Sequence, residues 1–181
     1  MSEAMDERTL LVYAMNGQAL TNAHGFPLRI YIPDHYGMKQ PKWITQLEVV
    51  DKLGSGFWED RGWSKTAIVQ TTSIIDTRQV DPATLANGGV FPLGGIAYAG
   101  ARQIKKVELQ IGDTPWVEVE LRDPPVSPLH WVQWRYDWKP AAGTYQVRVR
   151  ATDGDGNLQD PVSRGSLPEG ATGLDEVNIQ I

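Results

Sequence analysis

Several side chains that can carry positive charge lie close together in an otherwise acidic chain. The 181 residues include 17 Lys and Arg against 22 Asp and Glu, a net charge of −5. Yet His24, Arg29, Lys39 and Lys42 follow one another closely, interleaved with glycines and prolines. Such a segment can bring cationic side chains and main-chain N–H groups towards a phosphate or another anion. No P-loop is present, so the spacing alone leaves open whether these cations form an anion site or are scattered surface charges.

The tryptophans offer a second kind of chemistry. In the segment HWVQWRYDW, Trp134 and Trp138 share one strand face with Val132 and Tyr136, which is the spacing of a sandwich core. Trp131 lies on the opposite face and is the candidate for an exposed ring that stacks on a ligand such as a sugar. Packing in the core or in an interface is the favoured interpretation of the set, and ligand stacking is the alternative.

Composition excludes several classes of site. The chain has no cysteine, which rules out disulfides, zinc thiolate sites, iron–sulfur clusters and a cysteine nucleophile. No histidine and carboxylate spacing predicts a metal site, and no serine elbow is present. The acidic balance argues against nucleic-acid binding. No apolar run approaches the roughly 20 residues of a membrane span, and the acidic start is unlike a signal peptide. The compartment is left open.

Strand patterns dominate from residue 66 onwards and predict a mainly β fold. The clearest alternation is in residues 105–111, where Val107, Leu109 and Ile111 are expected to face inward. About seven strands, separated by turn signals every 8–12 residues or so, are typical of an immunoglobulin-like β-sandwich. The strands are expected at 67–75, 94–100, 105–111, 116–121, 130–138, 144–152 and 174–181.

The remaining segments give mixed signals. Apolar residues at helical spacing predict a helix at 10–14, before an Asn-Gly turn, and alternation predicts strands at 28–32 and 43–50. Residues 81–85 are expected to form one helical turn capped by an aspartate. The sequence at 153–157 is expected to be a plain turn, because it lacks the ligand spacing of a calcium loop. A boundary near 62–65 separates this irregular first third, an α+β segment, from the sandwich.

The order of residues in the first third resembles a known family. The string AMNGQALTNAHGFPLRIYIPDHYGMKQPKWITQLE, followed by GFWEDRGWS, resembles the sulfite oxidase family of molybdopterin-dependent oxidoreductases. Further along, GGIAYAGAR, KKVELQIGD and VRVRATDGDGN resemble the C-terminal dimerisation domain of that family. The resemblance covers nearly the whole chain, from Leu10 to Ile181.

This resemblance implies roles for particular residues. In the family, the histidine and arginine of HGFPLR contact the molybdopterin cofactor, which implies this role for His24 and Arg29. The segment ending in the lysine of KW also lines the pterin site in the family, which implies this role for Gln40, Pro41 and Lys42. The arginine of AGAR reaches the substrate pocket, so Arg102 is the candidate catalytic residue that binds an oxyanion; a surface arginine at a strand end is the alternative. His35 departs from the family pattern and is interpreted as a loop residue, not a ligand.

The missing cysteine shapes the functional prediction. The family holds molybdenum through a cysteine upstream of HGFPLR, and this chain has none. We therefore expect residues 1–65 to be the last piece of the molybdopterin-binding domain, and residues 66–181 to be the dimerisation domain. The chain would be a C-terminal fragment that forms a homodimer, needs the missing upstream domain, and alone binds no molybdenum cofactor and is inactive. The parent reaction would be a two-electron oxygen-atom transfer, such as sulfite to sulfate.

A second class of function stays open at this point. The sandwich could be a free-standing immunoglobulin-like binding module for protein or glycan, without catalysis, that uses Trp131 and its neighbours. Neither the substrate nor the electron acceptor of a parent enzyme follows from the sequence.

Overall fold

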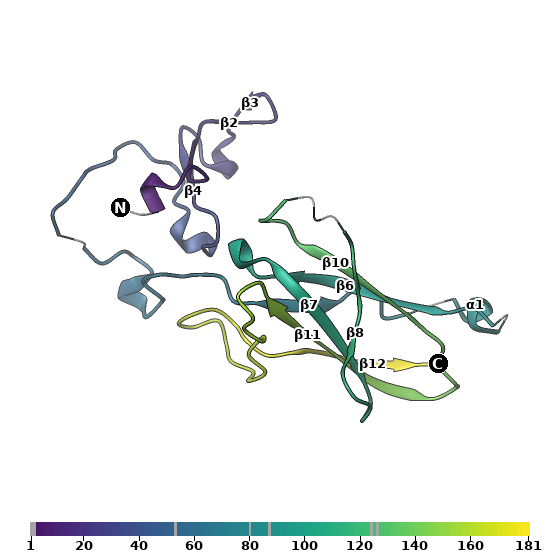
Figure 1. Ribbon diagram of the computed structural model, residues 1–181. Helices are drawn as coiled ribbons and strands as arrows, with labels where there is room; N and C mark the ends of the chain where they lie inside the picture. The colour runs from purple at the N-terminus through teal and green to yellow at the C-terminus, as the bar shows by residue number, and fades with distance from the viewer. Residues whose placement is uncertain (1–2, 53, 80, 87, 124, 126) are drawn as a thin grey trace. The chain divides into compact units, whose positions relative to one another are not determined.

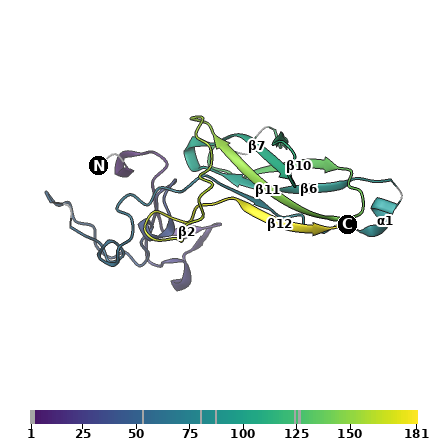
Figure 2. The ribbon, with the colours of Figure 1, turned by 90° about the horizontal axis from the view of Figure 1, so that it is seen from below.

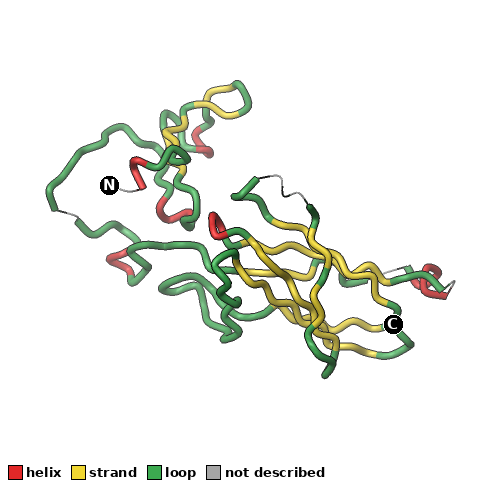
Figure 3. The backbone as a smooth tube through the Cα atoms, viewed as in Figure 1, coloured by secondary structure: helices red, strands yellow, loops and turns green. Residues whose placement is uncertain are grey.

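A computed structural model describes residues 3–52, 54–79, 81–86, 88–123, 125 and 127–181. The chain divides into two compact units. The first unit contains the residues up to Val69 together with Leu167–Gly170, and the second contains Gln70–Ser166 and Ala171–Ile181. Short elements and loops make up the first unit, whereas long strands make up most of the second (Figure 3).

The first unit is built from short elements. They are the 3-10 helices η1 (Glu3–Met5), η2 (Asn22–His24), η3 (Gly37–Lys39) and η4 (Glu59–Arg61), and the strands β1 (Leu10–Val12), β2 (Ala14–Met15), β3 (Gln18–Ala19) and β4 (Arg29–Tyr31). Strand β1 pairs antiparallel with β4, and β2 pairs antiparallel with β3. The predicted strand at 28–32 is confirmed by β4.

The helix predicted at 10–14 is wrong, because these residues form strands. Asn16 and Gly17 have φ angles of 52° and 76°, and they join β2 to β3. A two-residue turn with both φ angles positive suits a tight hairpin. Leu10 and Leu11 are both about half exposed, so the apolar period that suggested a helix does not mark a buried helix face.

The strand predicted at 43–50 is also wrong. These residues have no regular structure, and Val49 is 93% exposed, so no sheet covers the alternating side chains. Instead, the start of this segment runs beside β4. The N–H of Ile30 donates to Pro41 O at 3.1 Å, and the N–H of Ile44 donates to Leu28 O at 2.9 Å.

The second unit is a sandwich of two four-stranded antiparallel sheets, which confirms the mainly β fold. Figures 1 and 2 show the long strands of the unit running alongside one another. One sheet has the order β5 (Thr72–Ile75), β6 (Phe91–Tyr98), β10 (Val132–Trp138), β9 (Glu120–Leu121). The other has the order β12 (Asp175–Gln180), β11 (Thr144–Asp153), β7 (Ile104–Ile111), β8 (Val117–Glu118). The unit also contains α1 (Pro82–Ala86) and the 3-10 helix η5 (Gly100–Arg102).

The core of the second unit lies between the two sheets. Val107 and Leu109 of β7 are at most 2% exposed, as their alternation predicts, while Ile111 packs at the margin of the core. From the other sheet, Trp134 is 3% exposed and lies over Gly95. A Cβ atom at Gly95 would lie only 2.7 Å from Cζ2 of Trp134, so this glycine makes room for the indole.

The predicted positions of the other motifs in the second unit are largely confirmed. Trp131 is 40% exposed, and one face of its ring stacks on Tyr98 with 4.9 Å between centroids. Helix α1 forms where one helical turn was expected, and the N–H of Ala83 donates to the Asp81 carboxylate at 2.9 Å. Residues 154–156 form a turn.

The described residues contain neither a group of side chains suited to a metal ion nor a helix suited to crossing a membrane. No group of three or more His, Cys, Asp or Glu side chains in the described parts is placed to hold a metal ion. No described helix has the length and apolar character needed to cross a membrane.

Candidate cofactor-binding site

The candidate site is built on the tight turn around η2. The carbonyl oxygen of Thr21 accepts hydrogen bonds from the N–H groups of His24, Gly25 and Phe26 at 3.0 to 3.1 Å. The Thr21 hydroxyl also accepts from the His24 N–H, at 3.4 Å. Gly25 closes the turn with a φ of 111°, a left-handed conformation that favours glycine. The turn therefore presents the carbonyl groups of its last residues to neighbouring side chains.

Arg29 and Lys42 converge on this turn. Arg29 Nη1 donates to His24 O at 3.1 Å, and Lys42 Nζ donates to Ala23 O at 3.0 Å. Both side chains pack against Gly25, since a Cβ atom there would lie 3.0 Å from Lys42 Cβ and 3.1 Å from Arg29 Cβ. The pairing of residues 41–44 with β4 is what brings Lys42 beside Arg29. We name His24, Arg29 and Lys42 the cationic cluster.

The cationic cluster has hydrogen-bonding capacity that the protein does not use. Arg29 Nε is buried and finds no acceptor among the described residues. The His24 side chain is exposed, and none of its ring hydrogen bonds is formed within the described part of the chain. A buried donor without a partner costs about 1–3 kcal/mol. An anion or a carbonyl oxygen that accepted from Arg29 would remove this cost.

Trp43 is a residue that sequence reasoning did not assign to the site. Its indole Nε1 donates to Asn22 O at 2.8 Å, and Lys42 Nζ lies 4.9 Å from the ring centroid. The ring is nevertheless 59% exposed, so it offers a flat apolar face beside the cationic cluster. Such a face can stack on a planar ligand. The sequence signal was available, because Trp43 directly follows Lys42 in the KW string.

Gln40 and Pro41 support the backbone near the cluster. The side-chain amide of Gln40 donates to Ile32 O at 3.2 Å and to His35 O at 3.0 Å, which fixes the loop after β4. The carbonyl of Pro41 accepts from Ile30. His35 is a loop residue whose Nδ1 lies 2.8 Å from Pro33 O.

Lys39 does not join the cationic cluster. Its ammonium group forms an ion pair with Glu59, in which the pKa of the Glu59 carboxyl is lowered chiefly by the hydrogen bond from Lys39. The charge of Lys39 is therefore already balanced. The side chains of Arg29 and Lys42 therefore meet at the carbonyl groups of Ala23 and His24, whereas Lys39 pairs with Glu59.

Arg102 lies in the second unit, apart from the residues of the cluster in the chain. Its Nε donates to the Asp153 carboxylate at 3.1 Å, and its carbonyl accepts from the Gly154 N–H at 2.9 Å. Asp153 is 1% exposed. Burial raises the pKa of Asp153, but hydrogen bonds from Asn157 and Arg102 outweigh it and leave this pKa below its usual range. The turn at 153–157 thus anchors the arginine.

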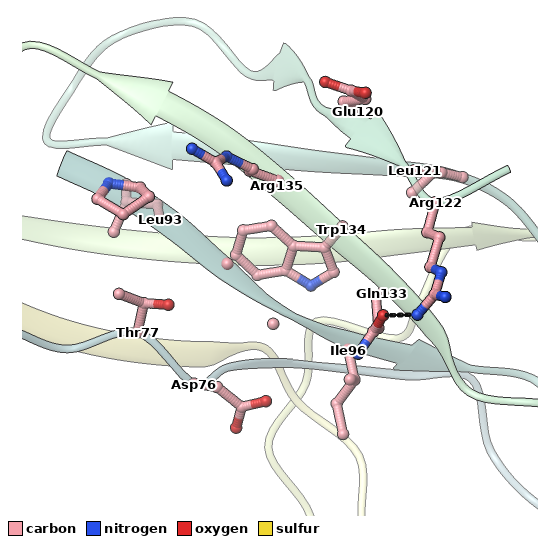
Figure 4. Close-up of a pocket in the computed structure, with 13 residues that line it drawn as sticks. Asp76, Thr77, Leu93, Ile96, Glu120, Leu121, Arg122, Gln133, Trp134 and Arg135 are labelled. Atoms are coloured by element: carbon pink, nitrogen blue, oxygen red, sulfur yellow. Dashed lines mark hydrogen bonds between the residues drawn. The ribbon is translucent and has the colours of Figure 1, made fainter. Parts of the chain in front are cut away.

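A cavity of about 540 Å³ lies against β6, β9 and β10 of the second unit (Figure 4). Two arginines and two carboxylates are among its lining residues, and Arg122 Nη1 donates to Gln133 Oε1 at 2.7 Å. None of the site residues predicted from the sequence lines it.

Comparison with known proteins shows similarity to sulfite oxidases. The family described as the oxidoreductase molybdopterin binding domain matches residues 1–58, which include the cationic cluster. The sulfite oxidase of Arabidopsis thaliana is 30% identical over 138 residues, covering 64% of this chain and 34% of that protein. The mitochondrial sulfite oxidase of Drosophila melanogaster is 27% identical over 190 aligned residues, covering 88% and 33% respectively. Residues 1–58 therefore match the molybdopterin-binding family, and the chain is similar to sulfite oxidases over most of its length.

The likeness to this sulfite oxidase family extends to the fold. The sulfane dehydrogenase SoxCD from Paracoccus pantotrophus matches with a TM-score of 0.73 and 20% sequence identity, over 99% of this chain and 50% of that chain. At this identity the likeness shows the fold alone. The chain spans about a third of the length of the sulfite oxidases it matches.

The residues present fit the cofactor of the sulfite oxidase family. A molybdopterin combines a planar pterin with a phosphate group. The unpartnered Nε of Arg29 needs an acceptor, and Lys42 brings a second positive charge to the same turn. The exposed face of Trp43 is flat. The donor set therefore suits an anionic group attached to a planar ring.

Proposed function

We propose that this chain supplies part of the cofactor site and the dimerisation domain of a sulfite-oxidase-like enzyme. In this proposal residues 1–65 are the last part of the molybdopterin-binding domain, and residues 66–181 form a dimerisation domain. The observation that carries it is the buried, unpartnered Nε of Arg29 beside Lys42, inside the segment that matches the cofactor-binding family.

Each residue of the proposed cofactor site has a physical role. Arg29 donates to a phosphate oxygen of the cofactor, and Lys42 adds a point charge next to it. His24 hydrogen-bonds to an edge of the pterin. Gln40 and Pro41 hold the backbone that positions these side chains. When bound, the cofactor supplies a molybdenum centre for two-electron oxygen-atom transfer.

Arg102 is proposed to bind the substrate oxyanion. A guanidinium group suits sulfite or a similar anion, because it presents several N–H donors in one plane. The buried carboxylate of Asp153 holds the Nε end of this guanidinium in place. Oxidation of sulfite to sulfate, or of a related sulfur compound, is therefore the reaction proposed for the parent enzyme.

We also propose that the chain is the C-terminal part of that parent. It has no cysteine, so a thiolate ligand for molybdenum has to come from polypeptide beyond this chain. On its own the chain is expected to hold no stoichiometric molybdenum and to leave sulfite unoxidised. Metal analysis that found one molybdenum per chain would contradict this expectation.

The cofactor proposal can be tested on the full chain with inorganic pyrophosphate as a probe. Calorimetry would measure the affinity of each variant, and nuclear magnetic resonance would follow the side-chain Nε–H signal of Arg29 in the wild type during a titration. We expect saturable shifts in the wild type and affinity about tenfold or more weaker in Arg29→Ala, because a charge-assisted hydrogen bond is lost.

Lys52→Ala is the matched control, since it removes an exposed cation of the same unit outside the cluster. Its affinity should equal that of the wild type. Equal weakening by Arg29→Ala and Lys52→Ala would overturn the proposal, because binding would then follow net charge alone.

A further inference from the structure

The second unit contains a cavity at one end of its sandwich, and no residue of the candidate cofactor site lines it. Its volume is about 400 Å³, and we name it the sandwich-end cavity. The residues that line it come from both sheets and from the turn after β7: Leu109, Ile111, Gly112, Thr114, Val117, Tyr136, Trp138 and Tyr145.

The cavity exists because both sheets end in very short strands on this side. Strands β8 and β9 contain two residues each, and the chain passes between the sheets at Val119. Val119 is 6% exposed and completes the core. Val117 lies two residues before Val119 and pairs with the buried Leu109, so it occupies a position on the inner face of its sheet. Val117 is nevertheless 43% exposed. An interior position therefore stays open to solvent.

The lining is apolar and aromatic, and it carries no charged side chain. The rings of Trp138 and Tyr145 meet edge to face with 4.7 Å between centroids, and Tyr145 Oη donates to Ala141 O at 3.1 Å. These contacts hold the aromatic walls in place. Within the described residues, neither Tyr136 Oη nor Trp138 Nε1 forms a hydrogen bond. Trp138 Nε1 can therefore donate to a ligand, and Tyr136 Oη can donate to a ligand or accept from one.

The size of the cavity decides what can occupy it. A volume of about 400 Å³ lies in the range of small-molecule sites. By contrast, a standard protein interface uses about 20–30 residues on each side, many more than line this cavity. We propose that the sandwich-end cavity binds a small uncharged aromatic molecule with one hydrogen-bond acceptor or donor. This proposal does not rest on the function proposed above.

Indole is a suitable probe because it is neutral, planar and small. Titrated into the full chain, it should shift the indole N–H signal of Trp138 and the methyl signals of Leu109, Ile111 and Val117 in a saturable way. The signals of Val49 in the first unit should not move. Shifts that fail to saturate up to the solubility of indole would overturn the proposal.

Val117→Trp should fill the mouth of the cavity and weaken indole binding about tenfold or more, because the added ring takes the space of the ligand. Val162→Trp is the control, since Val162 is 53% exposed in the same unit and does not line the cavity. Val117→Phe repeats the test if the tryptophan variant does not fold. Equal binding by the Val117 and Val162 variants would contradict the proposal.

Discussion

Arg29 and Arg102 are held in opposite ways. Arg29 uses Nη1 to bind a carbonyl, while its buried Nε has no acceptor in the described parts of the chain. Arg102 directs its Nε at the carboxylate of Asp153, which is almost fully buried. The first arrangement leaves a donor for a ligand, and the second fixes the guanidinium before any ligand arrives.

Asp153→Asn should destabilise the chain by about 2–3 kcal/mol at pH 7, because a buried charged partner of Arg102 is lost. The pKa of Asp153 is lowered in the folded state from the usual 3.8. Its contribution to stability is therefore present above about pH 4 and is lost as the pH falls through the lowered value. Urea unfolding would measure the free energy of unfolding of the variant and of the wild type at pH 7 and at acid pH. The difference between the two proteins should be smaller at acid pH.

Asp155→Asn provides the control for that prediction, because Asp155 is exposed in the same turn. Its stability should stay within about 0.5 kcal/mol of the wild type. A loss as large as that in Asp153→Asn would point to the turn and not to the buried ion pair.

The sequence indicated most of the cationic cluster through its resemblance to a family, but not its internal partners. His24, Arg29 and Lys42 were named together with Lys39, although Lys39 pairs with Glu59. A residue so far along the chain from Lys39 cannot be assigned as its partner from spacing alone. The same holds for Asp153, which was interpreted only as part of a turn.

At the scale of elements, two neighbouring glycines of β6 differ in the space that they leave for a Cβ atom. A Cβ atom at Gly95 would lie 1.9 Å from Ile74 O and 2.7 Å from Trp134 Cζ2. At Gly94 the nearest atoms would be 3.3 Å and 3.4 Å away. Gly95→Ala should therefore destabilise the sandwich by about 3 kcal/mol, and Gly94→Ala by less than about 1 kcal/mol. Thermal unfolding of the pair would check this, and equal effects would contradict it.

The turn after η2 allows a similar test of the candidate site. Gly25→Ala adds a Cβ atom in a left-handed conformation and against Lys42 and Arg29, so it should cost about 2 kcal/mol and weaken pyrophosphate binding. Gly17→Ala has a positive φ as well, but nothing lies within 4 Å of its Cβ position. Gly17→Ala should therefore lower the free energy of unfolding without weakening pyrophosphate binding. Calorimetry of both variants with pyrophosphate would separate the two effects, and unchanged binding in Gly25→Ala would contradict the prediction.

The strands of the sandwich were predictable because buried faces impose strict alternation. Residues 105–111 and 144–152 alternate over their whole length, and both lie in sheets with one face in the core. The segments at 10–14 and 43–50 misled for the converse reason. Their side chains are largely exposed, so no core enforces the apolar pattern that the sequence carries.

At the scale of the whole molecule, the two units differ in how much core they contain. All members of the main hydrophobic cluster belong to the second unit, whereas, prolines aside, only Leu20 and Ala67 are buried apolar side chains among the described residues of the first unit. Hydrogen exchange should therefore show weaker amide protection in β1 and β4 than in β7 and β11. Equal protection in the two units would contradict this expectation.

The proposed dimerisation domain predicts the mass of the particle in solution. Sedimentation at micromolar concentration should report twice the chain mass of 20.1 kDa. A monomer that stays unchanged on raising the concentration would contradict the dimer, while leaving the pyrophosphate test of the cofactor site unaffected.

Leu167–Gly170 belongs to the first unit although the residues on both sides of it belong to the second. Within the first unit, Ser64 N–H donates to Pro168 O at 3.0 Å, and a Cβ atom at Gly170 would overlap the ring of Tyr36. If the chain were cleaved once, after Val69, the N-terminal fragment would lack Leu167–Gly170 and the contacts that this segment makes with Ser64 and Tyr36. To prepare the first unit alone, Leu167–Gly170 would have to be added back as a separate peptide or joined through a short artificial linker.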